Sequence, residues 1–131
     1  MVDPSADAPT PHALGLGRNL DALANLIDAL RPLEAPTRRA ADLLADALTT
    51  GHQLLACGNG GSATEAAHMT TEFVVRYVDH RPAYPAIALT THGGDLTAIG
   101  NDYGYEPVFS RQVEAFGRPG DVLFAFSTSG K

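Results

Sequence analysis

The sequence predicts an α/β fold in which a parallel β-sheet is flanked by helices. Three short apolar runs, Gln53–Cys57, Ala86–Thr91 and Asp121–Phe126, alternate with segments of helical periodicity. This alternation favours a parallel sheet with right-handed crossovers, whose ligands collect at the carboxyl ends of the strands. Glycine or hydroxyl residues follow each run, so the polar loops are expected together at one edge of the sheet.

Composition and charge are those of an ordinary globular domain. The 131 residues are 44% hydrophobic and 18% charged, which is typical of soluble folded proteins. The net charge of −6 without a basic stripe argues against nucleic acid, and no run is long and apolar enough to span a membrane. The single cysteine forbids an internal disulfide and favours a cytoplasmic location. Residues 1–11, rich in Pro, Asp and Ala, predict a mobile tail, which leaves 12–131 as the domain.

Two amphipathic helices are expected before the first strand. From about His12 to Leu30, apolar residues recur at helical spacing, and Pro32 ends the helix. Leu33–Pro36 then connect to a second helix, with Thr37 as its N-cap and Gly51 as its stop. Each helix has an apolar side, which must cover a sheet face or another subunit.

The first strand runs into a glycine turn that has the features of an anion site. Gln53–Cys57 is followed by three glycines, Gly58, Gly60 and Gly61, and then by Ser62 at the start of a helical run. Glycine permits positive φ and close approach of a ligand to the backbone, and a helix N-terminus attracts negative charge. We expect Ser62 to be the N-cap or to turn its hydroxyl toward a phosphate. Glycine turns of this kind also occur where nothing is bound.

The helix after this turn, expected to end near Val78, has a polar side with chemical potential. Thr64, His68, Glu72 and Arg76 are spaced four apart and therefore follow one side of the helix. A His and a carboxylate at this spacing can share a metal ion, and a carboxylate near a sugar phosphate can act as a base. A single His on a helix is more often a surface residue. The combination of His68 and Glu72 with the glycine turn before them makes the prediction of a functional site more specific.

Between the second and third strands the sequence predicts a short helix, a polar loop and a longer helix. Gly93 and Gly94 turn the chain, and Asp95 caps a helix that reaches Ile99. Gly100–Gly104 is the polar loop, and Glu106–Phe116 is the longer helix. Its expected inward side chains are Val108, Phe109, Val113 and Phe116.

The third strand, Asp121–Phe126, is nearly all apolar, which is typical of a strand covered on both faces. Ser127–Gly130 follows it with three hydroxyl side chains. Together with residues 59–62 after the first strand, this turn would make a better anion site than either loop by itself. The alternative is an ordinary solvated turn.

These segments together resemble the sugar isomerase (SIS) domain family, and within it the phosphoheptose isomerases. The motifs are CGNGGS after a strand, H-x-x-x-E on a helix, R-P-x-Y-P-A-I-A, G-N-D-Y-G, and G-D-V-L-x-x-x-S-T-S-G, in that order. The resemblance implies a flavodoxin- or Rossmann-like fold. It also implies isomerisation of sedoheptulose 7-phosphate to D-glycero-D-manno-heptose 7-phosphate through an enediol, one zinc ion per subunit, and a homo-oligomer, commonly a tetramer.

The resemblance also assigns roles to positions of this sequence. His68 and Glu72 match two zinc ligands, Glu72 also matches the catalytic base, and Arg76 matches a position near the active site. The positions expected to bind the phosphorylated sugar are Asn59, Gly60, Gly61, Ser62, Glu72, Asn101, Asp102, Ser127, Thr128 and Ser129.

The resemblance extends from about His12 to the last residue, with departures at its end. Lys131 stands where the family's phosphate loop usually has Asn, and we expect the second half of the fold to be missing. That half carries the Gln and His that complete the family's zinc site, so the 131-residue chain by itself is expected to be inactive. One alternative is a non-catalytic SIS protein that binds the bacterial replication initiator; another is a sugar-phosphate sensing module. The presence of Glu72 favours the enzyme.

Overall fold

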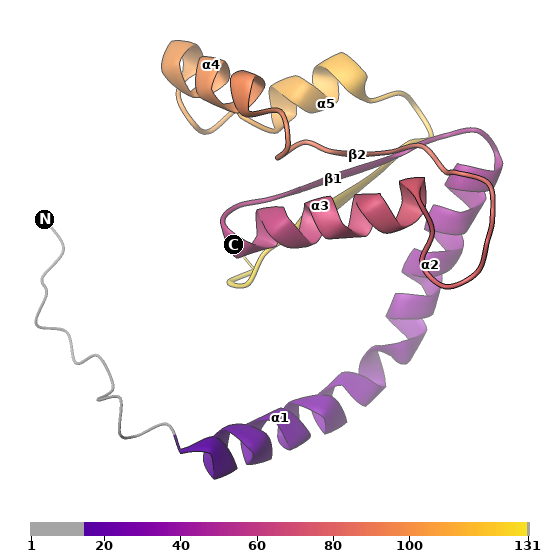
Figure 1. Ribbon diagram of the computed structural model, residues 1–131, viewed down its shortest axis with the longest axis vertical. Helices are drawn as coiled ribbons and strands as arrows, with labels where there is room; N and C mark the ends of the chain where they lie inside the picture. Colours follow the sequence, from indigo (N-terminus) through magenta and orange to yellow (C-terminus); the bar gives the residue numbers. More distant parts are fainter. Residues whose placement is uncertain (1–14, 131) are drawn as a thin grey trace, which may run out of the picture. The chain divides into compact units, whose positions relative to one another are not determined.

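The computed structural model describes residues 15–130, and the chain divides into two compact units, residues 1–40 and 41–131. The predicted tail and Lys131 lie outside the described residues. No helix within the described range combines the length and apolar character of a membrane span. Figure 1 shows the course of the chain, with labels on most of its helices and strands.

The first two helices of the chain follow one another without the predicted connector. Helix α1 (Leu16–Leu30) leads into a single 3-10 turn, η2 (Arg31–Leu33), and α2 (Glu34–Thr49) begins directly after it. The prediction that α2 starts after Thr37 is therefore wrong. Pro36 falls in the first turn of α2, where backbone N–H groups have no intrahelical acceptor, so proline is tolerated there. Glu34 also suits the positive end of the helix dipole.

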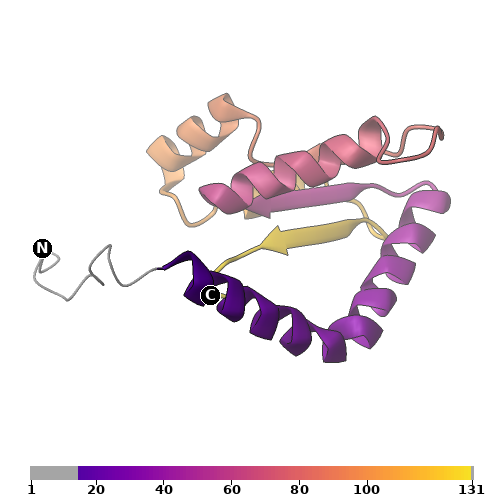
Figure 2. The same ribbon diagram turned by 60° about the horizontal axis from the view of Figure 1, so that its bottom comes forward.

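The second unit is built on a three-stranded parallel sheet, as the sequence predicts. The central strand β1 (Leu54–Gly58) pairs with β2 (Ala86–Ala88) on one side and β3 (Val122–Phe126) on the other. Figure 2 shows β1 and β3 running side by side in the same direction. Strand β2 is shorter than predicted because Thr91 turns back, its hydroxyl donating to the Ala88 carbonyl at 2.8 Å.

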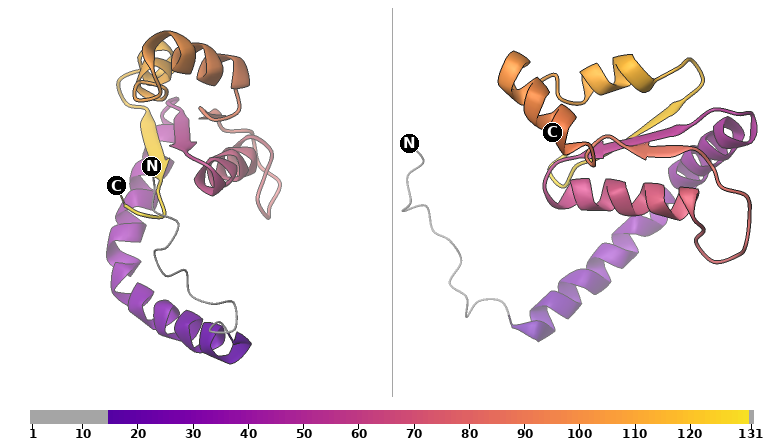
Figure 3. Two further views of the ribbon diagram at one scale, coloured as in Figure 1. Left: turned by 90° about the vertical axis from the view of Figure 1, so that its left-hand side faces the viewer. Right: turned by 45° about the horizontal axis from the view of Figure 1, so that its top comes forward.

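Helices cover both faces of this sheet. Figures 1 and 3 show α3 (Gly61–Val74) on one face and α4 (Gly93–Tyr103) with α5 (Ser110–Phe116) on the other. Alternation along β1 sends Leu54 to the α3 side and Leu55 to the α5 side. Leu54 packs with residues of α2 and α3, namely Leu44, Leu48, Met69 and Phe73. Leu55 packs on the other face with Cys57, Leu89, Phe109 and Val113.

Several helix ends differ from the prediction. Helix α3 ends at Val74, not near Val78, because the Arg81 guanidinium and the Tyr84 N–H donate to carbonyls of its last turn. Helix α4 continues to Tyr103, past the predicted end at Ile99, and stops where Gly104 takes a φ of 85°.

Helix α5 is shorter than predicted at its start. It begins at Ser110 because the residues before it form turns, closed by the Val108 N–H donating to the Tyr105 carbonyl at 3.2 Å. Val108 is buried, as expected. Phe116 was predicted to face inward but is 37% exposed.

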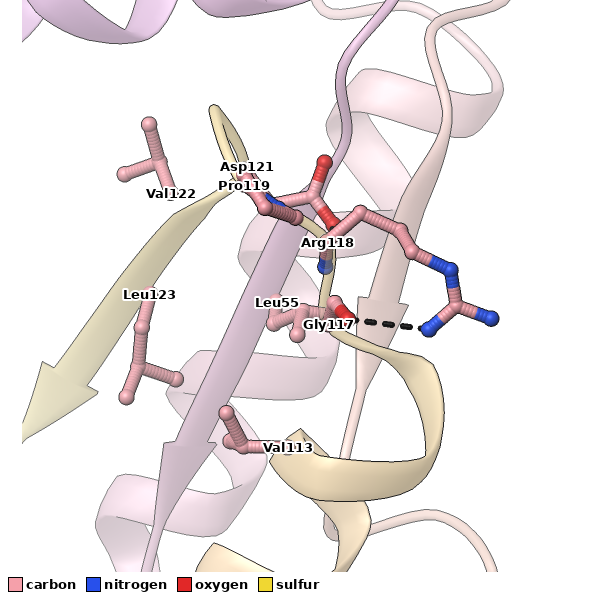
Figure 4. A pocket seen from close by; sticks show the side chains of 8 residues that line it. All are labelled: Leu55, Val113, Gly117, Arg118, Pro119, Asp121, Val122 and Leu123. Carbon is pink, nitrogen blue, oxygen red and sulfur yellow. Dashed lines mark hydrogen bonds between the residues drawn. The ribbon is translucent and has the colours of Figure 1, made fainter.

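Strand β3 is an edge strand of the described sheet. Leu123 is 50% exposed and Phe124 is 36% exposed, so the expectation that both faces are covered is wrong for the described residues. A pocket of about 200 Å³ opens beside the start of β3, between Val113 of α5 and Leu123 (Figure 4). Because ligands of parallel sheets gather at the opposite, carboxyl ends of the strands, this pocket is separate from the predicted site.

Candidate active site

The turn after β1 is built tightly around its glycines. A Cβ on Gly58 would lie 2.7 Å from the Ser62 carbonyl oxygen, so no larger residue fits. Gly60 has φ 58° and ψ −123°, a conformation that side-chain-bearing residues rarely adopt. This bend starts α3 at Gly61, with Gly60 in the N-cap position. The prediction that Ser62 is the N-cap is therefore wrong: Ser62 is the second residue of the helix and is 9% exposed.

A polar pocket of about 200 Å³ lies where β1 and β3 end. Its lining residues come from the glycine turn and from the hydroxyl turn, and they are Asn59, Ser62, Phe126, Ser127, Thr128 and Ser129. The two turns meet because β1 and β3 are direct neighbours in register, with Gly58 opposite Phe126. The pocket thus combines side-chain hydroxyls, a carboxamide and the positive end of α3, a set suited to an oxyanion such as a phosphate.

The hydroxyl turn is held in shape by its own side chains. The backbone N–H of Gly130 donates to the Ser127 hydroxyl at 2.9 Å, and the hydroxyl oxygens of Ser127 and Ser129 lie 3.5 Å apart. Gly130 has a φ of 69°, which lets the chain close this turn. The hydroxyls of Ser127 and Ser129 are therefore gathered at one end of the pocket.

His68 and Glu72 lie one turn apart on α3 and converge. Nε2 of His68 is 3.2 Å from Oε1 of Glu72, and the side chains are 68% and 32% exposed. They could present a nitrogen and an oxygen to one metal ion. Among residues 15–130 no group of three His, Cys, Asp or Glu side chains gathers around a common point. The described chain therefore offers two of the three or four protein ligands that a zinc site has.

Besides His68 and Glu72, five predicted positions are absent from the lining of this pocket, namely Gly60, Gly61, Arg76, Asn101 and Asp102. Asn101 and Asp102 belong to the last turn of α4, not to a loop, and the Asn101 amide donates to the Asp102 carboxylate at 2.8 Å. Arg76 lies beyond the end of α3 and donates to the Val78 carbonyl at 2.9 Å. The four-residue spacing of the polar side therefore ends, as a helical feature, at Glu72.

Sequence reasoning missed two residues that touch the site. Phe126 lines the pocket from the end of β3, at a position where the sequence predicts only a strand. Tyr105 donates its hydroxyl to Oδ1 of Asn59 at 2.6 Å, across 46 positions of sequence. The only local hint of the Tyr105 contact is the glycine before it, which ends α4.

Cys57, at the end of β1, belongs to the core. Burial raises the pKa of its thiol, so the side chain stays protonated at neutral pH and packs with Leu55 and Leu89. It offers no nucleophile to the pocket.

Relatives of this chain are phosphoheptose isomerases. That of Shewanella loihica is 51% identical over 104 residues, 79% of this chain and 53% of that protein. That of Shewanella oneidensis is 46% identical over 110 residues, 84% of this chain and 56% of that protein. The structure of the Neisseria gonorrhoeae enzyme matches with a TM-score of 0.76 at 43% identity, over 86% of this chain and 58% of that chain. The Francisella tularensis structure gives 0.66 at 32% identity, over 84% and 62%.

These matches confirm the resemblance drawn from the five motifs and the parallel sheet flanked by helices. The chain spans about half the length of the curated relatives it matches, 53% and 56% in the two cases above. The sequence model of the SIS domain matches residues 20–131, which is most of the chain. The protein therefore belongs to the SIS domain family.

Proposed function

We propose that the full-length protein is a phosphoheptose isomerase, which converts sedoheptulose 7-phosphate to D-glycero-D-manno-heptose 7-phosphate. The observation that carries this proposal is the pocket between Asn59–Ser62 and Ser127–Ser129, at the start of the helix that bears Glu72. An anion site and a carboxylate on one helix are what an isomerase of phosphorylated sugars requires. The names of the relatives point to the same reaction.

In this proposal the phosphate sits in the polar pocket. Ser62 and the hydroxyls of residues 127–129 donate hydrogen bonds to its oxygens, and the N-terminus of α3 complements its charge. Asn59, Gly60 and Gly61 let the ligand approach the backbone, and Asn101 and Asp102 contact the sugar when it is bound. Because the hydroxyl turn is already folded by its internal hydrogen bonds, little ordering of that turn is needed on binding.

Glu72 is the proposed base. It lies ten residues after Ser62 on α3, which is roughly 15 Å along a helix axis, and side chains lean back toward the N-terminus. This spacing leaves room for an open-chain sugar between the anchored phosphate and the carboxylate. Glu72 removes a proton from C1 of the ketose while the C2 carbonyl oxygen takes up a proton, which gives the enediol. A proton is then delivered to C2 while the C1 hydroxyl releases its proton, which gives the aldose. Positioned proton transfer of this kind contributes roughly 10²–10⁴ in rate.

A zinc ion would be held by His68 and Glu72, whose side chains already converge, together with ligands from elsewhere in the protein. When bound, it would polarise the carbonyl and hydroxyl oxygens of the sugar. The role of the His68 ring in this chain is to supply one nitrogen ligand and to keep the Glu72 carboxylate in place.

We further propose that the protein is a cytoplasmic homo-oligomer, in which another subunit covers the apolar side of α1. The apolar side of α1 is half exposed or more at every position, through Leu16, Leu20, Leu23, Leu26, Ile27 and Leu30. Such a stripe is typical of a helix that packs against another subunit, and a tetramer would bury it. Light scattering that shows only monomer at micromolar concentration contradicts this assembly.

The proposed reaction is tested with the purified full-length protein, zinc and sedoheptulose 7-phosphate in deuterium oxide. An enediol route predicts an aldose product that carries solvent deuterium at C2, because the proton delivered there exchanges with solvent. Absence of conversion, or an aldose product without deuterium at C2, contradicts the proposal. Binding of the sugar phosphate without conversion would instead favour the sensing module.

A further inference from the structure

Tyr105 and Asn59 form a contact that joins two separate parts of the second unit. The Tyr105 hydroxyl donates to Oδ1 of Asn59 at 2.6 Å, within the range of a strong O–H···O hydrogen bond. Asn59 lines the polar pocket, whereas Tyr105 comes from the segment between α4 and α5. The contact therefore connects this segment to the turn that begins the candidate site.

The position of Tyr105 is set by its own segment. Gly104 turns the chain with a φ of 85°, and the Tyr105 carbonyl accepts the Val108 N–H at 3.2 Å. Val108 is 1% exposed and therefore fixes this turn to the core. The tyrosine ring itself is largely exposed, so its hydroxyl reaches Asn59 from an anchored backbone without being held by packing of the ring.

The contact with Tyr105 determines which polar atom of the Asn59 carboxamide is left for a ligand. An asparagine side chain has one accepting oxygen and one nitrogen with two N–H donors. The Tyr105 hydroxyl occupies the oxygen, which defines the orientation of the amide plane and leaves the N–H donors for a ligand. A phosphorylated sugar offers only acceptor oxygens at its phosphate, so an amide presented with its nitrogen available is the productive orientation.

We propose that Tyr105 is a positioning residue for the sugar-phosphate site: its hydroxyl holds the Asn59 carboxamide so that the amide nitrogen donates to the bound ligand. This inference rests on the proposed function for its ligand, but the Tyr105–Asn59 coupling does not depend on turnover.

The matched control is Tyr103, two positions away. Tyr103 is also largely exposed, but its ring packs against the guanidinium of Arg111, whose carbon lies 4.0 Å from the ring centroid. Replacing either tyrosine by phenylalanine removes one hydroxyl and keeps the ring. Only Tyr105→Phe removes the bond to Asn59.

The test uses the full-length protein with Tyr105→Phe, Tyr103→Phe, Asn59→Ala and the double variant Tyr105→Phe with Asn59→Ala. In a heteronuclear NMR spectrum, Tyr105→Phe should shift the side-chain amide signals of Asn59, identified by their loss in Asn59→Ala, and Tyr103→Phe should not. Sedoheptulose 7-phosphate affinity should fall about 3- to 10-fold in Tyr105→Phe, the range of one hydrogen bond, and turnover at saturation should change less.

In the double variant the loss should equal that of Asn59→Ala, because the tyrosine acts through the amide. The inference is overturned if Tyr105→Phe leaves the Asn59 signals unshifted. It is also overturned if Tyr105→Phe lowers affinity as much in the Asn59→Ala variant as in wild type. If the wild-type protein binds no sugar phosphate, the proposed function fails. The shift of the Asn59 amide signals, with inorganic phosphate as the probe, then still tests whether Tyr105 positions the Asn59 carboxamide.

Discussion

Arg81 donates from Nη2 to the backbone carbonyl of Glu72 at 2.5 Å, and from Nη1 to the carbonyl of Phe73 at 2.9 Å. Its guanidinium also lies over the ring of Tyr84, 4.9 Å from the centroid. One side chain from the loop before β2 thus satisfies carbonyls at the C-terminal end of α3, where the helix dipole favours a cation. Arg81 therefore holds the turn of α3 that carries Glu72, the proposed base.

Arg81→Ala should destabilise the fold by about 1–3 kcal/mol, since the carbonyls of the last turn lose charged donors and the aromatic rings lose their partner. Arg81→Lys keeps the charge but not the two-pronged geometry, and should recover only part of this loss. Denaturant unfolding measures both. The control is Arg39→Ala on the exposed surface of α2, expected within about 0.5 kcal/mol of wild type. Equal effects of Arg81→Ala and Arg39→Ala would refute the capping role.

Gly58→Ala should disrupt the turn that forms the polar pocket. The added Cβ would lie 2.7 Å from the Ser62 carbonyl oxygen, and both groups are backbone-fixed, so α3 has to shift. We expect a loss of about 1–3 kcal/mol in unfolding free energy, the usual cost of overpacking, together with weaker phosphate binding.

The control for this change is Gly100→Ala, where a Cβ meets nothing within 4 Å. Gly100 lies inside α4, so alanine should leave stability unchanged or raise it by up to about 1 kcal/mol. Thermal unfolding and a phosphate titration of Gly58→Ala separate the two effects. A variant with wild-type stability and wild-type phosphate affinity would show that the turn tolerates a side chain.

The parallel sheet and the meeting of two polar turns were predictable because both depend on local patterns. Apolar runs predicted β1 and β3. The residues that follow these two strands then meet because β1 and β3 pair in register. Helix ends were not predictable in the same way, because contacts distant in sequence decide them. The end of α3 depends on Arg81, and its start depends on the backbone conformation of Gly60. The Tyr105 contact with Asn59 has no periodic signal at all.

Asp121 gives the fold a predicted acid sensitivity. Burial by itself would raise the pKa of this carboxyl, but hydrogen bonds from the Gln53 side chain and backbone and from the Arg118 backbone, with the charge of His52, lower it. The side-chain amide of Gln53 donates to Oδ2 of Asp121 at 2.8 Å, and the backbone N–H of Gln53 donates to Oδ1 at 3.0 Å. These two bonds tie the starts of β1 and β3 together.

Because the folded pKa of Asp121 is lowered, its stabilising contribution is present above the unfolded pKa of about 3.9 and is lost as the pH falls through the folded value. Unfolding free energy measured between about pH 6 and pH 3 should therefore fall less steeply in Asp121→Asn than in wild type. Gln53→Ala, which removes one of the donors, should give an intermediate slope. Identical slopes in wild type and Asp121→Asn would contradict this role.

Glu72 is the proposed base of the isomerisation. Glu72→Gln keeps the size of the side chain and removes the base, so it should abolish conversion of sedoheptulose 7-phosphate while leaving its binding largely intact. Glu65→Gln is the matched control, since Glu65 lies exposed on the same helix.

Turnover of full-length Glu72→Gln should be measured beside wild type and Glu65→Gln, with sugar-phosphate affinity determined in parallel. We expect turnover of Glu72→Gln at least about 100-fold below wild type with near-normal affinity, and near-normal turnover in Glu65→Gln. Turnover of Glu72→Gln above about a tenth of the wild-type value would contradict the assignment of Glu72 as the base.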